Sequence, residues 1–158
     1  MYREPLMPDE ASTAYPNAFQ QPVSGEGETP ASAVKMTFTT NLSAVRGLVE
    51  EYARKAGLSE QRIVDLVLAV SEIAANTVRH AKSAGNLVIW HSKREIICEM
   101  RDKGHITDPL AGTRPPEAEA LGGHGLWLVN QVCDQVEIRS GAAGTAIRLH
   151  MLLGGSRA

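Results

Sequence analysis

Residues 63–78 of the chain read IVDLVLAVSEIAANTV. Apolar residues recur here every three or four positions, which predicts an amphipathic helix from a cap at Ser59 to about Ala81. The polar stripe of this helix carries Glu72 and Asn76, which lie four residues apart and therefore project from one face. We expect the apolar face to pack on a partner surface and the polar pair to stay accessible.

Two more helices and five strands are predicted around this one. A helix capped by Asn41 or Ser43 runs to Ala56 and ends at Gly57, and another begins at about Gly125. The alternating segments expected to form strands are 34–38, 87–91, 95–101, 136–139 and 145–151. This order predicts an α+β two-layer sandwich, in which about three helices cover one face of a mixed, mostly antiparallel sheet.

Composition limits the class of protein. The 158 residues are 43% hydrophobic, which suits one domain with one core, and the net charge of −2 gives no basic field for direct DNA binding. No apolar stretch is long enough for a membrane span or a secretory signal, so we expect a cytoplasmic protein. Cys98 and Cys133 lie in apolar runs and are expected to be buried thiols.

The predicted domain does not include the ends of the chain. Residues 1–33 hold five of the eight prolines and five acidic residues against one arginine, which predicts a disordered tail. The compact domain is expected from 34 to 153, followed by a flexible C-terminus at 154–158. Within the domain, residues 103–122 lack periodicity and gather glycine and proline, which is typical of a functional loop such as a lid.

Two further short patterns contain residues that could bind a ligand. Asp102-Lys103-Gly104 places a carboxylate and a glycine after a predicted strand, and the run Gly122-Gly123-His124-Gly125 leads into a predicted helix. The N-terminus of a helix favours anions such as phosphate. Each pattern alone is equally compatible with an ordinary turn, as the Glu72 and Asn76 pair is with a solvated helix face.

Taken in order, the three patterns resemble the N, G1 and G2 boxes of the GHKL superfamily of ATPases and kinases. The short length and the segments 76–81 and 125–129 are most similar to its anti-sigma factor serine/threonine kinases. This resemblance implies an ATP- and Mg²⁺-dependent kinase that sequesters a sigma factor and phosphorylates an anti-anti-sigma (STAS-type) protein. It also implies a homodimer.

The resemblance assigns roles to individual residues. It implies that Glu72 activates the acceptor hydroxyl, that Asn76 binds Mg²⁺, and that Asp102 accepts a hydrogen bond from the adenine amino group. The remaining cofactor-binding positions it implies are Gly104, Gly123, His124 and Gly125.

One position departs from the family pattern, because Ile106 stands where the second glycine of the G1 box is usual. This departure keeps a second hypothesis open. In it, the protein is a non-catalytic anti-sigma switch that binds its partners through the same fold, with nucleotide binding weak or absent.

Deleting residues 1–30 is expected to leave the melting temperature nearly unchanged, because a proline-rich acidic segment can contribute little to a core. Differential scanning calorimetry of the full and truncated chains measures this. A drop of many degrees would mean that the tail packs on the domain.

Overall fold

A computed structural model describes residues 29–81, 84–104 and 124–154. Residues 1–28 of the predicted tail, nearly all of the predicted lid and residues 155–158 lie outside these ranges. The elements in chain order are β1 (Val34–Phe38), α2 (Leu42–Ala56), α3 (Glu60–Asn76), the π-helical segment η2 (Thr77–Ala81), β2 (Gly85–His91), β3 (Glu95–Asp102), α4 (His124–Val132), β4 (Gln135–Gly141) and β5 (Gly144–Leu152).

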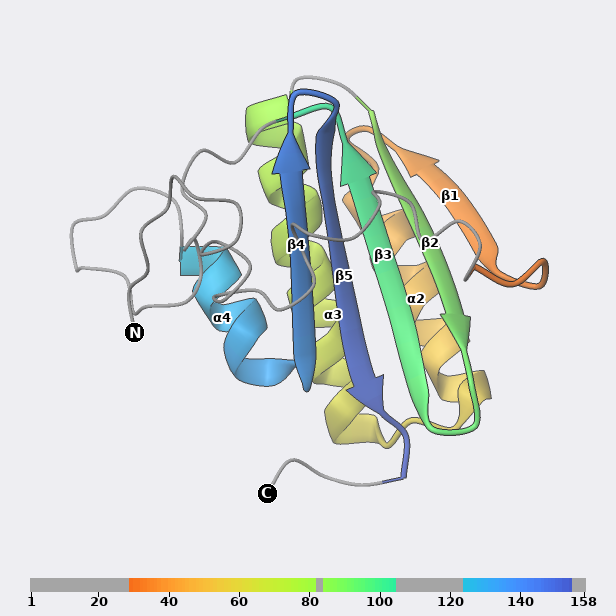
Figure 1. Cartoon of the computed structure of the whole chain (residues 1–158). Coiled ribbons are helices and arrows are strands. Elements are labelled where there is room, and N and C mark those ends of the chain that lie inside the picture. Colours follow the sequence, from red (N-terminus) through yellow and green to blue (C-terminus); the bar gives the residue numbers. More distant parts are fainter. Residues whose placement is uncertain (1–28, 82–83, 105–123, 155–158) are drawn as a thin grey trace.

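The five described strands form one sheet in the order β1-β2-β3-β5-β4, and each neighbouring pair is antiparallel. Helices α2, α3 and α4 all lie on the same face of this sheet, and the other face carries no described helix (Figure 1). The predicted two-layer α+β fold is therefore confirmed. Where a mixed sheet was expected, the described strands pair in the antiparallel sense throughout.

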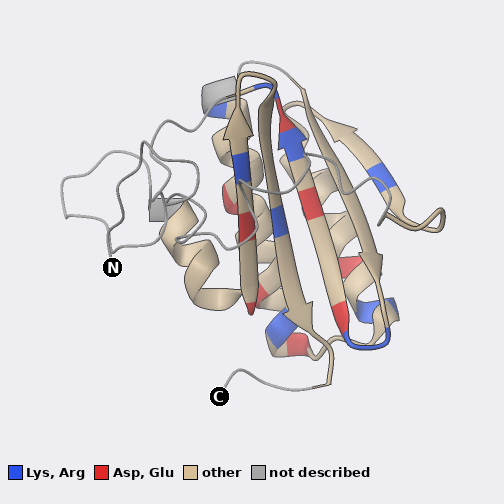
Figure 2. Cartoon of the chain, viewed as in Figure 1, with Lys and Arg blue, Asp and Glu red and all other residues tan. Residues whose placement is uncertain are grey.

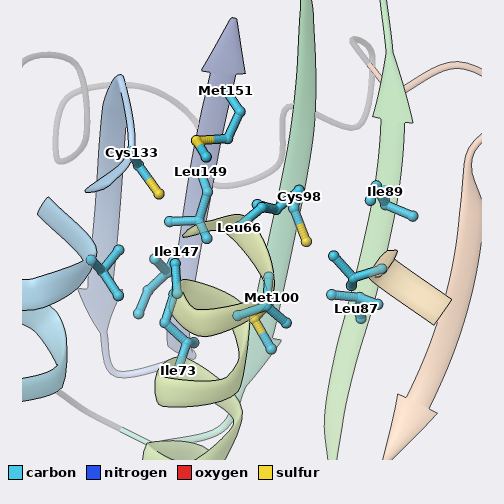
Figure 3. Packing of buried hydrophobic residues seen from close by; sticks show 14 of the residues in the cluster. Leu66, Ile73, Leu87, Ile89, Cys98, Met100, Cys133, Ile147, Leu149 and Met151 are labelled. Carbon is cyan, nitrogen blue, oxygen red and sulfur yellow. The ribbon is translucent and has the colours of Figure 1, made fainter. Parts of the chain in front are cut away.

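The core lies between the sheet and the helices (Figure 3). Strand β3 turns Ile96, Cys98 and Met100 toward it, while the alternate residues of the strand face the other way, as a period of two requires. Cys98 and Cys133 are both buried free thiols, which confirms the prediction, and burial raises the pKa of the Cys98 thiol. Helix α3 contributes Leu66 and Ile73 from its apolar stripe.

The helix ends follow the sequence with two exceptions. Ser59 caps α3 by accepting a hydrogen bond from the Arg62 N–H, and Gly57 ends α2 with φ of 99°. Asn41 is the N-cap residue of α2, but its side chain does not cap the helix, because Oδ1 accepts instead from the N–H of Thr39 at 3.0 Å. Helix α3 also stops short of its predicted end, since the chain widens into η2 after Asn76.

A buried ion pair joins three elements at the end of the molecule where α3 begins. Arg62 of α3 pairs with Asp134, which directly precedes β4, and also donates to the Val132 carbonyl at 3.4 Å. Asp134 accepts in turn from the backbone N–H of Leu152 in β5, at 2.7 Å. Removing one member of such a pair leaves the other buried and uncompensated.

Charged residues lie along β3, β4 and β5 (Figure 2). In β3 the period of two places Glu99 on the face of the sheet away from the core. Glu99 is buried there between Arg101 and Arg148, at 2.7 and 2.9 Å. Farther along β5, the ring of His150 contacts Glu95 at 3.1 Å and Glu137 at 2.9 Å. Opposite charges on adjacent strands help to fix the strand register on this face.

The neighbours of His150 also set its protonation. Burial lowers the pKa of His150, but the hydrogen bond to Glu137 and the charges of both carboxylates outweigh it and leave the pKa raised. A raised folded-state pKa stabilises the fold below the usual histidine pKa, and this stabilisation is lost as the pH rises through the raised value. The hydrogen bond from His150 lowers the pKa of Glu137, although burial partly opposes this.

The β4–β5 turn requires glycine at position 144, because the φ of 128° there is a conformation that other residues rarely adopt. A Cβ atom there would lie 2.3 Å from the carbonyl oxygen of Asp102. We expect Gly144→Ala to lower the free energy of unfolding by about 2–4 kcal/mol, measured by urea denaturation.

Its turn partner provides the control. Gly141 has open space where a Cβ would stand, so Gly141→Ala should change the free energy of unfolding by less than about 1 kcal/mol. Equal effects of the two substitutions would contradict the close approach at Gly144.

Candidate functional site

The last turns of α3 present the two residues that its polar stripe singled out. Glu72 and Asn76 are both half-buried on this helix, one turn apart. Within the described residues, the Glu72 carboxylate has no hydrogen-bond or ion-pair partner. A carboxylate held on a rigid helix without a partner is available to accept a proton from a ligand.

Asn76 differs from Glu72 in having a neighbour. Its side-chain oxygen accepts a hydrogen bond from the guanidinium of Arg79, three residues later in η2. Arg79 is exposed, so the contact is solvated and little free energy is needed to exchange it. The amide oxygen remains chemically suited to a hard cation such as Mg²⁺, provided that Arg79 moves aside.

The residue after Asn76 connects the helix to the sheet. The Thr77 hydroxyl donates a hydrogen bond to Oδ2 of Asp102, at 2.8 Å, across the gap between α3 and the end of β3. Thr77 is only 4% exposed. This bond places the carboxylate of Asp102 beside the end of the helix that carries Glu72 and Asn76.

Asp102 receives a second donor from its own turn, because the N–H of Gly104 donates to Oδ1 at 2.6 Å. The turn is held in place from the β4–β5 hairpin. Thr145 donates to the carbonyl of Gly104 at 2.9 Å, and since its single proton is used there, Ser140 must donate to Thr145 in their 2.8 Å contact. Three segments distant in the chain thus meet around Asp102 and Gly104.

The structure brings together most of the predicted site residues that it describes. Asn76, Asp102 and Gly104 are linked through Thr77, and Glu72 lies one turn before Asn76 on the same helix. His124 and Gly125 form the start of α4, as predicted, and α4 packs against α3. Gly123 and Ile106 lie outside the described residues.

Three polar residues of the site were not found from the sequence. No recognisable sequence motif includes Thr77, Ser140 or Thr145, because each matters only through the residues that the fold places opposite it. Asp102 pairs with Thr145 in the β3–β5 register, and that pairing is set by the whole sheet. A clue was present for Thr77, which is a polar residue on the buried side of a helical pattern.

The oxygen atoms of Asp102 and Asn76 determine which ligands the site can bind. From the described residues, each oxygen of Asp102 accepts one hydrogen bond and retains capacity for another, so the carboxylate suits a ligand with an N–H group, such as an amino-purine. Among the described residues, no group of three or more His, Cys, Asp or Glu side chains could hold a metal. Asn76 alone therefore suits a cation that takes its other ligands from phosphates and water.

Comparison with known proteins supplies independent context. Residues 37–151 match the family described as the histidine kinase-like ATPase domain. The chain is 30% identical over 112 residues to the serine-protein kinase RsbW of Halalkalibacterium halodurans, covering 62% of this chain and 68% of that protein. It is 27% identical over 110 residues to RsbW of Bacillus licheniformis, covering 60% and 68%.

A solved structure agrees with the fold. The crystal structure of the RsbU and RsbW domains of a Mycobacterium tuberculosis protein superposes with a TM-score of 0.59 at 21% identity. The match covers 81% of this chain and 34% of that one, so this chain spans about a third of the larger protein.

Asn76→Ala is expected to weaken Mg·ATP binding about tenfold or more, because it removes the amide oxygen that would bind the metal. Calorimetry with and without Mg²⁺ measures this, and the difference from wild type should shrink when Mg²⁺ is absent. Gln61→Ala, at an exposed position of α3 far from the site, is the control. Identical Mg·ATP affinities of wild type and Asn76→Ala would remove the assignment.

Proposed function

The chain belongs to the histidine kinase-like ATPase family, and from this premise we propose that it is an anti-sigma factor with ATP-dependent serine/threonine kinase activity. In this role it sequesters a sigma factor and phosphorylates an anti-anti-sigma (STAS-type) protein. The proposal is supported by the similarity to two RsbW serine-protein kinases over about two thirds of their length.

The observation that carries the kinase proposal is that the carboxylate of Glu72 is available to accept a proton. Its carboxylate has no partner among the described residues and lies one helical turn from Asn76. In phosphoryl transfer the acceptor hydroxyl must lose a proton as its oxygen forms a bond to the γ-phosphorus, while the bond to the β–γ bridging oxygen breaks and ADP leaves. Glu72 is the base that takes this proton.

The other residues bind the nucleotide. Asp102, already oriented by Thr77 and Gly104, accepts from the amino group of adenine. Asn76 supplies the protein oxygen for Mg²⁺, which neutralises phosphate charge when bound. His124 and Gly125 are the first residues of α4, and Gly123 precedes them in the sequence. Together they offer the phosphates the N-terminus of a helix, where N–H groups favour anions.

The cellular setting follows from the same proposal. The protein acts in the cytoplasm, where sigma factors are found, as a homodimer and without contacting DNA itself. None of the described helices is both long and apolar enough to cross a bilayer.

A second function is favoured by one contact. The Arg79 guanidinium occupies the oxygen of Asn76, and a positive charge there competes with Mg²⁺. Together with Ile106 at a usual glycine position, this supports a non-catalytic anti-sigma switch with weak or absent nucleotide binding.

The two functions are separated by incubating the protein with Mg·ATP and candidate STAS-type partners and measuring intact masses. The kinase proposal expects one added phosphate on a partner. Sigma-factor retention without any added phosphate would favour the switch.

Glu72→Gln is expected to reduce phosphate transfer by about 10²-fold to 10⁴-fold, because it keeps the size of the side chain and removes the proton acceptor. Binding of Mg·ATP and retention of the sigma factor should persist. Partner phosphorylation and sigma-factor retention are compared for wild type and variant at saturating Mg·ATP.

Asp65→Asn is the matched control, since it makes the same change elsewhere on α3. It should transfer phosphate at the wild-type rate. Robust transfer by Glu72→Gln would remove Glu72 as the base.

A further inference from the structure

Thr77 is a buried polar residue that takes no direct part in the proposed phosphate transfer. It is 4% exposed and lies in the π-helical segment that follows Asn76. Placing a hydroxyl in such a position costs free energy unless it is hydrogen-bonded. Its bond of 2.8 Å to Asp102 provides that partner.

The direction of this bond is determined by chemistry. An ionised carboxylate only accepts hydrogen bonds, so the single hydroxyl proton of Thr77 points at Oδ2 of Asp102. Oδ1 receives the N–H of Gly104 from the turn. With one donor on each oxygen, the plane of the carboxylate is fixed.

We propose that Thr77 is a positioning residue that makes the site selective for 6-aminopurine over 6-oxopurine nucleotides. This inference rests on the proposed nucleotide-binding function and adds the residue that sets base selectivity. Asp102, held in one plane by its two donors, accepts from an exocyclic amino group. A carbonyl oxygen at the same position faces a negative charge with no proton between them and is rejected.

The turn around Asp102 explains why the carboxylate cannot adapt to the wrong base. Thr145 holds the carbonyl of Gly104 at 2.9 Å, and Gly144 brings the β4–β5 turn against the backbone of Asp102. Rotation of the carboxylate therefore breaks the bonds to Thr77 and Gly104 without offering new ones.

The test compares the affinities of Mg·ATP and Mg·ITP, measured by calorimetry, for wild type, Thr77→Val and Thr77→Ser. Valine keeps the shape of threonine and removes the donor. We expect wild type to prefer ATP, and Thr77→Val to bind ATP about 10-fold to 100-fold more weakly while its ITP affinity changes less than about threefold. Thr77→Ser, which restores the hydroxyl, should recover the ATP-to-ITP ratio.

The ratio separates this role from a structural one, because general loosening of the domain would weaken both nucleotides equally. An unchanged ratio in Thr77→Val would overturn the inference and leave the proposed function intact. Failure of wild type to bind either nucleotide would instead contradict the proposed function. If Thr77→Val does not fold, Thr77→Ala removes the donor with less bulk beside Asp102. An unchanged ATP-to-ITP affinity ratio in Thr77→Ala would likewise overturn the inference.

Discussion

The pairing of β3 with β5 is the constraint on which the rest of the molecule depends. These strands are neighbours in the sheet although the loop, α4 and β4 separate them in the chain. Their register sets Asp102 opposite Thr145 at one end and Glu95 opposite Leu152 at the other. A slip of one residue would turn Cys98 and Met100 out of the core and Glu99 into it. The same pairing therefore determines the core and the position of the site.

The site forms where the two layers meet at one end of the sheet. Packing of the apolar stripe of α3 fixes the helix on the sheet, but packing alone leaves the exact height of its last turn undetermined. The bond between Thr77 and Asp102 sets that height. Its counterpart at the other end of α3 is the buried pair of Arg62 and Asp134. Glu72 and Asn76 are thus carried by a helix held at both ends, which suits residues that must be placed accurately.

The face of the sheet away from the helices is organised differently from the core. Charged groups on three strands form pairs across strand boundaries, and the Arg148 guanidinium lies 5.3 Å from the centre of the Trp90 ring. Pairing of this kind holds register without a second layer of helices. Strands β3 and β5 supply residues both to the candidate site and to the charged pairs on the face away from the helices.

The sequence by itself determined the helices, the strands and the fold class, because periodicity and capping are local: the stripe of α3, the Ser59 cap and the alternation in β5 are each visible within a few residues. It also selected Glu72, Asn76 and Asp102 through short patterns with the spacing of a known family. Only the tertiary structure decided which residues support them. Ser140 matters through Thr145, which faces it across the β4–β5 hairpin. Thr77 and Thr145 matter because the packing of α3 and the sheet register place them against Asp102 and Gly104, and contacts between residues 25 and 41 positions apart leave no periodic pattern in the chain.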